Sequence, residues 1–151
     1  MAVGRNDRHG VSIDGLEELN YMAERVSPRV ALNLATQTVN YIAGEVRKQA
    51  RRRAPKDSGT LRKAIRNVRR RGKPDTVIVD VRVAHGKDAA HDGFYWHFIE
   101  FGTVRQGAQP FIAPTVQQIE PQIPEMYRKE FGKRLEKQLE KEAKKLGVNK
   151  R

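Results

Sequence analysis

Pro28 and Pro55 bracket the longest stretch of helical periodicity in the chain. Between them, small and apolar residues recur at intervals of three and four, which places them on one face of a helix. Ser27 suits the N-cap of a helix with proline at its first position, and Pro55 disfavours helical backbone in Ala54. We therefore predict one long amphipathic helix from Pro28 to about Ala54, whose apolar stripe another element must cover.

Valine alternates with polar residues from Thr76 to Ala84, and this spacing of two predicts a strand. The aromatic-rich run from Phe94 to Phe101, ended by Gly102, is predicted to be a second, antiparallel strand. The first strand is expected to present Val77, Val79, Val81 and Val83 on one face and Asp80 and Arg82 on the other, and the second to present Tyr95, His97, Ile99 and Phe101 together.

The remaining segments are predicted to be mostly helical. Residues 13–26 carry a short helical pattern, and Thr60 to Val68 fits one or two helical turns better than a strand. Four prolines divide the C-terminal part, which favours a short helix from Ala113 to Ile119 and a longer one from Pro124 to Leu146. Because an isolated hairpin is marginal in water, a third or fourth strand is expected from residues 60–69, 104–112 or a neighbouring subunit.

These patterns predict an α+β fold in which a long N-terminal helix packs on a small antiparallel β-sheet, followed by a C-terminal helix. With 151 residues, of which 38% are hydrophobic, one modest core is expected. We predict a flexible N-terminal tail over residues 1–12, a single domain over 13–146 and a flexible C-terminal tail over 147–151.

Composition narrows the classes of function. The chain has no cysteine, so disulfides are excluded, and neither a signal sequence nor an apolar run that could span a membrane is present. A soluble protein made in the cytosol, with no membrane partner, is expected. Thirty Lys and Arg against eighteen Asp and Glu give a net charge of +12, which favours an acidic partner, either nucleic acid or protein.

Residues that could carry out catalysis or hold a cofactor do not form a recognisable pattern. His85, His91 and His97, with Asp88 and Asp92 between them, are spaced six apart, which matches no helical or strand face and no zinc motif. We therefore predict no catalytic residue, no metal and no cofactor. A small nuclease is the remaining enzyme hypothesis, and its best acids would be Asp88, Asp92 and Glu100.

Two arginine runs, Arg51, Arg52, Arg53 and Arg69, Arg70, Arg71, are the candidate contacts to nucleic acid or to an acidic partner. Clustered in space, they could neutralise phosphates without reading sequence, although charge runs are more often solvated faces. A basic nucleic-acid-binding module without catalytic activity is therefore kept as an alternative function.

Three motifs lie in order along the chain: Ala54-Pro55-Lys56-Asp57-Ser58-Gly59-Thr60-Leu61-Arg62, Trp96-His97-Phe98-Ile99-Glu100-Phe101-Gly102-Thr103 and Gln109-Pro110-Phe111-Ile112-Ala113-Pro114. With this order and spacing, the chain resembles the gp-ten-like family of siphophage head-tail joining, tail-completion or minor tail proteins over roughly residues 30–145. The residues that match the family pattern are Pro55, Asp57, Ser58, Gly59, Leu61, Arg62, Glu100, Phe101, Gly102, Thr103, Pro110, Phe111 and Pro114.

The resemblance implies a structural virion protein of a tailed bacteriophage. It would be a subunit of the ring at the head-tail connector, or neck, that completes the tail and joins it to the head around the DNA channel. The implied partners are copies of the chain in a hexamer, with a dodecamer as the alternative, together with head-connector and tail-tube or tail-terminator proteins, and DNA in the channel. The implied location is the virion, after assembly in the host cytoplasm.

Overall fold

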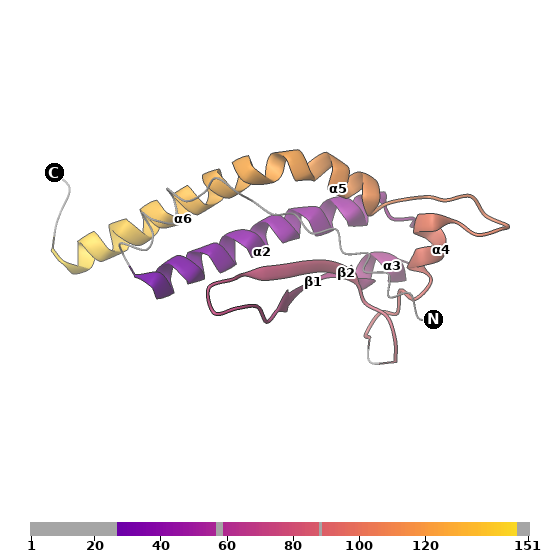
Figure 1. The fold of residues 1–151 in the computed structure, drawn as a ribbon, viewed down its shortest axis with the longest axis horizontal. Coiled ribbons are helices and arrows are strands. Elements are labelled where there is room, and N and C mark those ends of the chain that lie inside the picture. Colours follow the sequence, from indigo (N-terminus) through magenta and orange to yellow (C-terminus); the bar gives the residue numbers. More distant parts are fainter. Residues whose placement is uncertain (1–26, 57–58, 88, 148–151) are drawn as a thin grey trace.

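In a computed structural model, described for residues 27–56, 59–87 and 89–147, one long helix is the centre of an elongated α+β fold. Helix α2 has α6 along one side and a β-hairpin along the other (Figure 1). The fold class predicted from the sequence is confirmed, whereas the predicted helical segment 13–26 lies outside the described residues. The elements are α2 (Pro28–Arg53), α3 (Thr60–Ala64), β1 (Ile65–Arg70), β2 (Ile78–Val83), α4 (Trp96–Phe101), α5 (Ala113–Ile119), the 3₁₀-helix η1 (Glu120–Gln122) and α6 (Ile123–Lys145).

Helix α2 begins and ends at the prolines that the sequence singled out. Ser27 is the extended N-cap residue, but its side chain makes no capping hydrogen bond, and Pro28 occupies the first turn. At the other end, Ala54 leaves the helical conformation with φ −59° and ψ 138° before Pro55. Three arginines in the last turn place positive charge at the negative end of the helix.

The first of two hydrophobic clusters fills the interface between α2, α5 and α6. Phe131 is fully buried there, and its ring stacks on that of Tyr127 with the centroids 5.3 Å apart. Burial of Tyr127 raises the pKa of its phenol above the usual value. The buried members of the cluster are Leu34, Ile42, Ile119, Ile123, Tyr127, Phe131 and Leu135.

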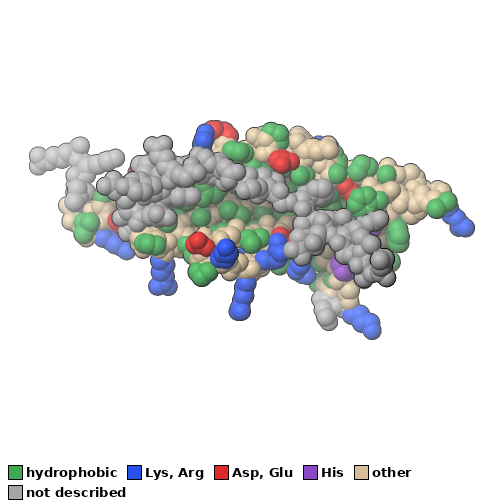
Figure 2. Space-filling model, viewed as in Figure 1, with side chains coloured by type: hydrophobic (Ala, Val, Ile, Leu, Met, Phe, Trp, Pro, Cys, Tyr) green, Lys and Arg blue, Asp and Glu red, His purple; other side chains and the backbone are tan. Residues whose placement is uncertain are grey.

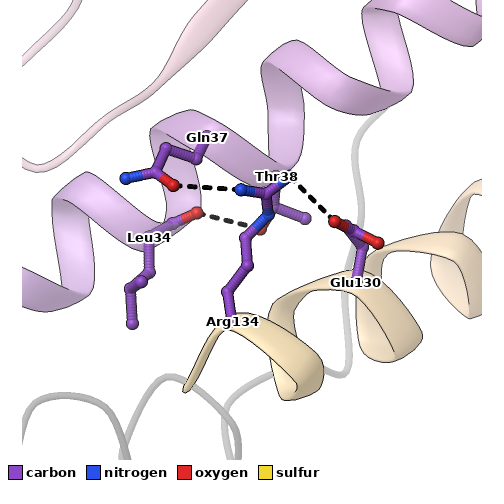
Figure 3. Close-up of polar contacts among 5 residues, drawn as sticks. All are labelled: Leu34, Gln37, Thr38, Glu130 and Arg134. Carbon is purple, nitrogen blue, oxygen red and sulfur yellow. Dashed lines mark hydrogen bonds and ion pairs between the residues drawn. The ribbon is translucent and has the colours of Figure 1, made fainter. Parts of the chain in front are cut away.

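Polar contacts at the edge of this interface fix the register of α6 against α2 (Figure 3). The guanidinium of Arg134 forms an ion pair with Glu130 at 2.8 Å, one turn away on α6, and donates to the amide oxygen of Gln37 on α2 at 3.0 Å. The hydroxyl of Thr38 is fully buried and donates to the carbonyl of Leu34 at 2.8 Å, so this hydroxyl is paired within α2.

The hairpin packs one face of its two strands on α2. The register pairs Ile65 with Val83, both buried, so Val79, Val81 and Val83 share the inner face as the alternation predicted. With its amide oriented to suit both groups, Asn67 donates to the Ala43 carbonyl and accepts from the Gly44 amide, each at 3.2 Å. Strand β1 therefore lies directly against the backbone of α2.

The predicted strand from Phe94 to Phe101 is wrong, because Trp96–Phe101 form the helix α4. In a helix, Trp96, Ile99 and Glu100 share the face that turns inward, and Glu100 is buried while Phe98 and Phe101 stay exposed. The strand preference of an aromatic run is weak compared with the gain from this packing.

The pairing partner of β2 is β1, which lies in the segment predicted to continue as helix. Helical turns from Thr60 to Ala64 are confirmed, but the chain then becomes extended at Ile65 and runs as a strand to Arg70. Ladder hydrogen bonds to β2 outweigh the local helical spacing that Val68 suggested. In the described part of the chain the sheet has these two strands, with α2 giving the support that an isolated hairpin lacks.

The predicted C-terminal division agrees with α5 and, to within one residue, with α6.

Replacing the buried Phe131 with alanine should lower the free energy of unfolding by about 3–5 kcal/mol, because a large cavity opens between α2 and α6. Urea denaturation followed by circular dichroism measures this loss. Leu139→Ala on the same helix, where the side chain is 44% exposed, should cost about 0.5 kcal/mol or less. Equal losses would contradict this description of the core.

Candidate assembly surface

The first motif builds the corner between α2 and α3. Gly59 adopts φ +71°, a left-handed conformation that glycine accepts without strain, and it directly precedes α3. Leu61 and Ala54 are buried together in the second hydrophobic cluster. The Nε and Nη2 atoms of Arg62 donate to the carbonyl of Ala54 at 3.0 and 2.8 Å, which satisfies a carbonyl at the end of α2.

Pro55 in this motif is half-buried at the corner, whereas Asp57 and Ser58 lie outside the described residues. Arg62 thus has a structural role that the sequence did not reveal, because only the fold brings it back to the end of α2. This charge-assisted contact between guanidinium and carbonyl ties α3 to the end of α2.

The second and third motifs are joined by the carboxylate of Glu100, which is 5% exposed. Its Oε2 accepts hydrogen bonds from the amides of Phe111 and Ile112 at 2.8 and 3.0 Å, and its Oε1 accepts from the amide of Ala113 at 2.8 Å. These amides begin α5 and have no partner within the helix, so the carboxylate satisfies them and compensates the positive end of the helix. We refer to this arrangement as the Glu100 cap.

Glycine is required directly after α4. Gly102 adopts φ +74°, and a Cβ atom there would lie 2.7 Å from the amide nitrogen of Ala108 and 2.9 Å from the carbonyl oxygen of Gln106. Thr103 continues the turn, since its Oγ1 accepts from the amides of Arg105 and Gln106. The loop between α4 and α5 is therefore folded back on itself.

The second half of this loop, which leads into α5, is bonded to both α4 and α5. The amide of Gln109 donates to the carbonyl of Ile99 at 2.8 Å. Phe111 is fully buried in the second cluster, and its carbonyl accepts from the hydroxyl of Thr115 at 2.6 Å. Pro114 lies in the first turn of α5, as the sequence predicted, and Pro110 is exposed on the loop.

These bonds hold a set of exposed apolar side chains at one end of the molecule, where Figure 1 shows α4 and its loop beyond the end of the hairpin. Phe94 and Phe101 are each 63% exposed, Phe98 is 55% exposed and Val104 is fully exposed. We call these four residues the docking surface. Large aromatics held open to solvent by a rigid support are typical of protein interfaces.

The sequence analysis missed this surface because the strand prediction placed Phe101 on one face with Tyr95, His97 and Ile99 and separated it from Phe98. A helical wheel over residues 96–101 would have shown Phe98 and Phe101 opposite Trp96 and Glu100. The sequence feature that could have indicated this arrangement is the charged Glu100 within the aromatic run. In a helix it shares the buried face of Trp96, and a buried carboxylate must find hydrogen-bond donors.

The histidines and acids considered for metal or catalysis are dispersed or already engaged. His85, His91 and His97 are exposed, and Asp88 lies outside the described residues. Asp92 accepts from the amides of Gly86 and Phe94 at 3.2 and 3.0 Å, so it closes its own loop. Within the described ranges, no group of three or more His, Asp or Glu side chains could hold a metal ion.

The six arginines predicted as contacts fall into two kinds. Arg51 donates to the carbonyl of Ile65, Arg53 to Gln118, and Arg70 pairs with Asp80. By contrast, Arg52, Arg69 and Arg71 are exposed, and Figure 2 shows Lys and Arg side chains projecting along the edge over the hairpin. The two runs do not form one continuous cluster.

The fold and this surface define a small α+β protein with a rigid apolar end. A family model described as "Bacteriophage HK97-gp10, putative tail-component" matches residues 18–102, more than half of the chain. The chain belongs to this HK97-gp10-like family of bacteriophage tail components. The match includes the first motif and the second as far as Gly102, and it ends before the third, short of the extent predicted from the sequence.

Other comparisons add no relative: no curated protein and no solved structure matches the chain. Among the described helices, none combines the length and the apolar character that crossing a bilayer demands.

Replacing Glu100 with glutamine should lower the free energy of unfolding by about 1–3 kcal/mol, because a side-chain NH₂ then faces a backbone donor. Hydrogen exchange of the Phe111, Ile112 and Ala113 amides should accelerate more than exchange in α2. Glu120→Gln, which removes an exposed carboxylate on the neighbouring η1, should leave both quantities nearly unchanged. Unchanged exchange at the three amides of the Glu100→Gln variant would contradict the Glu100 cap.

Proposed function

We propose that this chain is a structural virion protein of a tailed bacteriophage, a subunit of a ring at the head-tail connector. There it completes the tail and joins it to the head around the DNA channel. Membership of a family of phage tail components supports the general role. The resemblance of the three motifs to head-tail joining proteins supports the position at the neck.

The observation that carries the proposal is the docking surface. A monomer gains nothing from leaving Phe94, Phe98 and Phe101 in water, and each aromatic ring removed from water at an interface contributes substantially to binding. The Glu100 cap and the closed loop after Gly102 preorganise these rings, so little conformational entropy is lost when they are covered.

Ring closure requires two different surfaces on each subunit. The docking surface lies at the α4 end. The exposed Leu139, near the end of α6, and the exposed Leu146, which directly follows it, belong to the opposite end, where Figure 1 shows α6 ending. A contact between unlike ends is heterologous, and such contacts close into rings when the rotation between subunits allows it. We propose a hexamer, or a dodecamer, that meets head-connector and tail-tube or tail-terminator proteins in the virion.

Replacing both Phe98 and Phe101 with serine should abolish the oligomer while leaving the fold intact, because both side chains are exposed in the subunit. Light scattering across a range of protein concentrations measures the mass in solution, and circular dichroism confirms folding. In the phage, the variant should yield heads and tails that fail to join, which electron microscopy detects.

A double variant with Leu139→Ser and Leu146→Ser removes two exposed apolar side chains from the far end of α6. If unlike ends meet, this variant also weakens the oligomer, and mixing the two double variants permits a dimer through the intact ends. A wild-type protein that is monomeric alone and does not bind any neck or tail protein would overturn the proposed function. An oligomer insensitive to Phe98→Ser and Phe101→Ser would place the contact elsewhere.

A further inference from the structure

An open groove of about 570 Å³ lies beside α2. Its cationic lining consists of Arg47, Lys48, Arg51 and Arg52 from the second half of α2 and Arg62 from α3. Tyr41, which is 44% exposed, lines it one to two turns earlier on α2. We call this the cationic groove, and it shares no residue with the docking surface.

Among the described residues, a single carboxylate faces the five cations of the cationic groove. Glu45 is the only carboxylate in its lining, and it lies 3.8 Å from the ammonium of Lys48. The side chains of Arg47 and Arg52 make no ion pair or hydrogen bond with any other described residue. Burial, and then the nearby charge of Arg47, lower the pKa of Arg51, so two like charges are held close together.

Two of the guanidinium groups are held in position by the fold. Arg51 donates from Nε and Nη2 to the carbonyl of Ile65, at 3.2 and 2.7 Å, and Arg62 donates in the same way to Ala54. Each keeps one nitrogen, Nη1, without a partner among the described residues. A preorganised guanidinium loses little entropy on binding an anion, and its planar donors match the oxygens of a phosphate.

We propose that the cationic groove binds the phosphate backbone of nucleic acid. Four of its five cations are arginines, and residues 47 and 51 lie one helical turn apart, a rise of about 6 Å along α2. The groove is open, which suits a polymer that enters and leaves rather than a small enclosed anion. Tyr41 supplies an apolar surface against which a sugar can pack.

This inference does not rest on the proposed ring, and charge elsewhere in the chain provides a matched comparison. Helix α6 carries exposed Lys129, Lys133 and Lys137, but glutamates alternate with its lysines, and its surface there lies outside the groove. If net charge alone attracts DNA, removing three lysines from α6 should lower the affinity for DNA as much as removing three cations from the groove.

The test measures binding of a fluorescent 20-base-pair duplex by anisotropy, over a series of salt concentrations. The groove variant carries Arg47→Gln, Lys48→Gln and Arg52→Gln, and the control carries Lys129→Gln, Lys133→Gln and Lys137→Gln. Both variants lose three charges, and neither changes Arg51 or Arg62, whose structural bonds remain. The groove variant should bind roughly tenfold more weakly or worse, with a salt slope smaller by about three, and the control should stay near wild type.

Phosphate contacts carry no base information, so duplexes of different sequence should bind with equal affinity. Three results would overturn the proposal: no binding of wild type at low salt, equal loss in the two triple variants, or tighter groove-dependent binding of polyglutamate than of DNA. The last result would assign the groove to an acidic protein instead. The Phe98→Ser, Phe101→Ser protein should retain DNA binding per subunit, which separates failure of the groove from failure of the ring.

Discussion

A single buried carboxylate determines the geometry of the end of the molecule on which the proposed assembly depends. Glu100 reaches from α4 to three successive amides at the start of α5, and without it those donors would lie in a largely buried environment unpaired. The charge is tolerated because the amides, together with the dipole of α5, replace the water that it loses. Since these bonds join segments separated by an exposed loop, α4 cannot tilt without breaking them, and the aromatics on its outer face are held in a fixed array. The two motifs that flank the loop are therefore one structural unit.

Helix α2 supplies the other constraint, because every layer of the fold packs against it. One side buries Leu34 and Ile42 against α5 and α6, and the other receives the hairpin through Ala43 and Gly44. Strand β1 comes close enough to the helix for Asn67 to bond the Ala43 carbonyl and the Gly44 amide, and this contact with α2 supports a sheet of two strands. Towards its C-terminus, α2 changes character, with Ala50 still buried but arginines on the remaining faces. The long helix thus connects an apolar core at one end with a charged surface at the other.

Much of this architecture follows from local pattern in the sequence, and the failures have a common cause. Prolines and helical periodicity predicted α2, α5 and α6 because these helices are long or sharply bounded, and alternating valines predicted β2. The partner of β2 was misplaced because Ile65 and Val68 fit helical spacing, and only pairing with residues 78–83 makes them extended. Helix α4 was misassigned for a similar reason. Its aromatic residues fit a strand, and the helix is favoured by a contact that the local pattern does not contain, between Glu100 and the amides of residues 111–113. Site residues in the motifs were found by resemblance, but the bonds of Arg62 and Glu100 depend on contacts between segments that no local pattern contains.

The division of surfaces also shows how a protein with a net charge of +12 could use the proposed apolar contact for self-association. Repulsion between like-charged subunits would oppose a ring if the cations bordered the contact. At moderate salt, such repulsion acts mainly between charges that lie within about 8–10 Å of each other. The docking surface is formed by Phe94, Phe98, Phe101 and Val104, whereas cations line the α2 groove and project from the outside of the hairpin. At the other proposed contact, Leu139 and Leu146 lie among both lysines and glutamates of α6, so the charges there are mixed. Of the exposed side chains on α4 and its loop, Arg105 carries the permanent positive charge. Apolar burial can then drive association at one end while the charge remains free for an anionic partner, and binding such a partner would reduce the remaining repulsion between subunits.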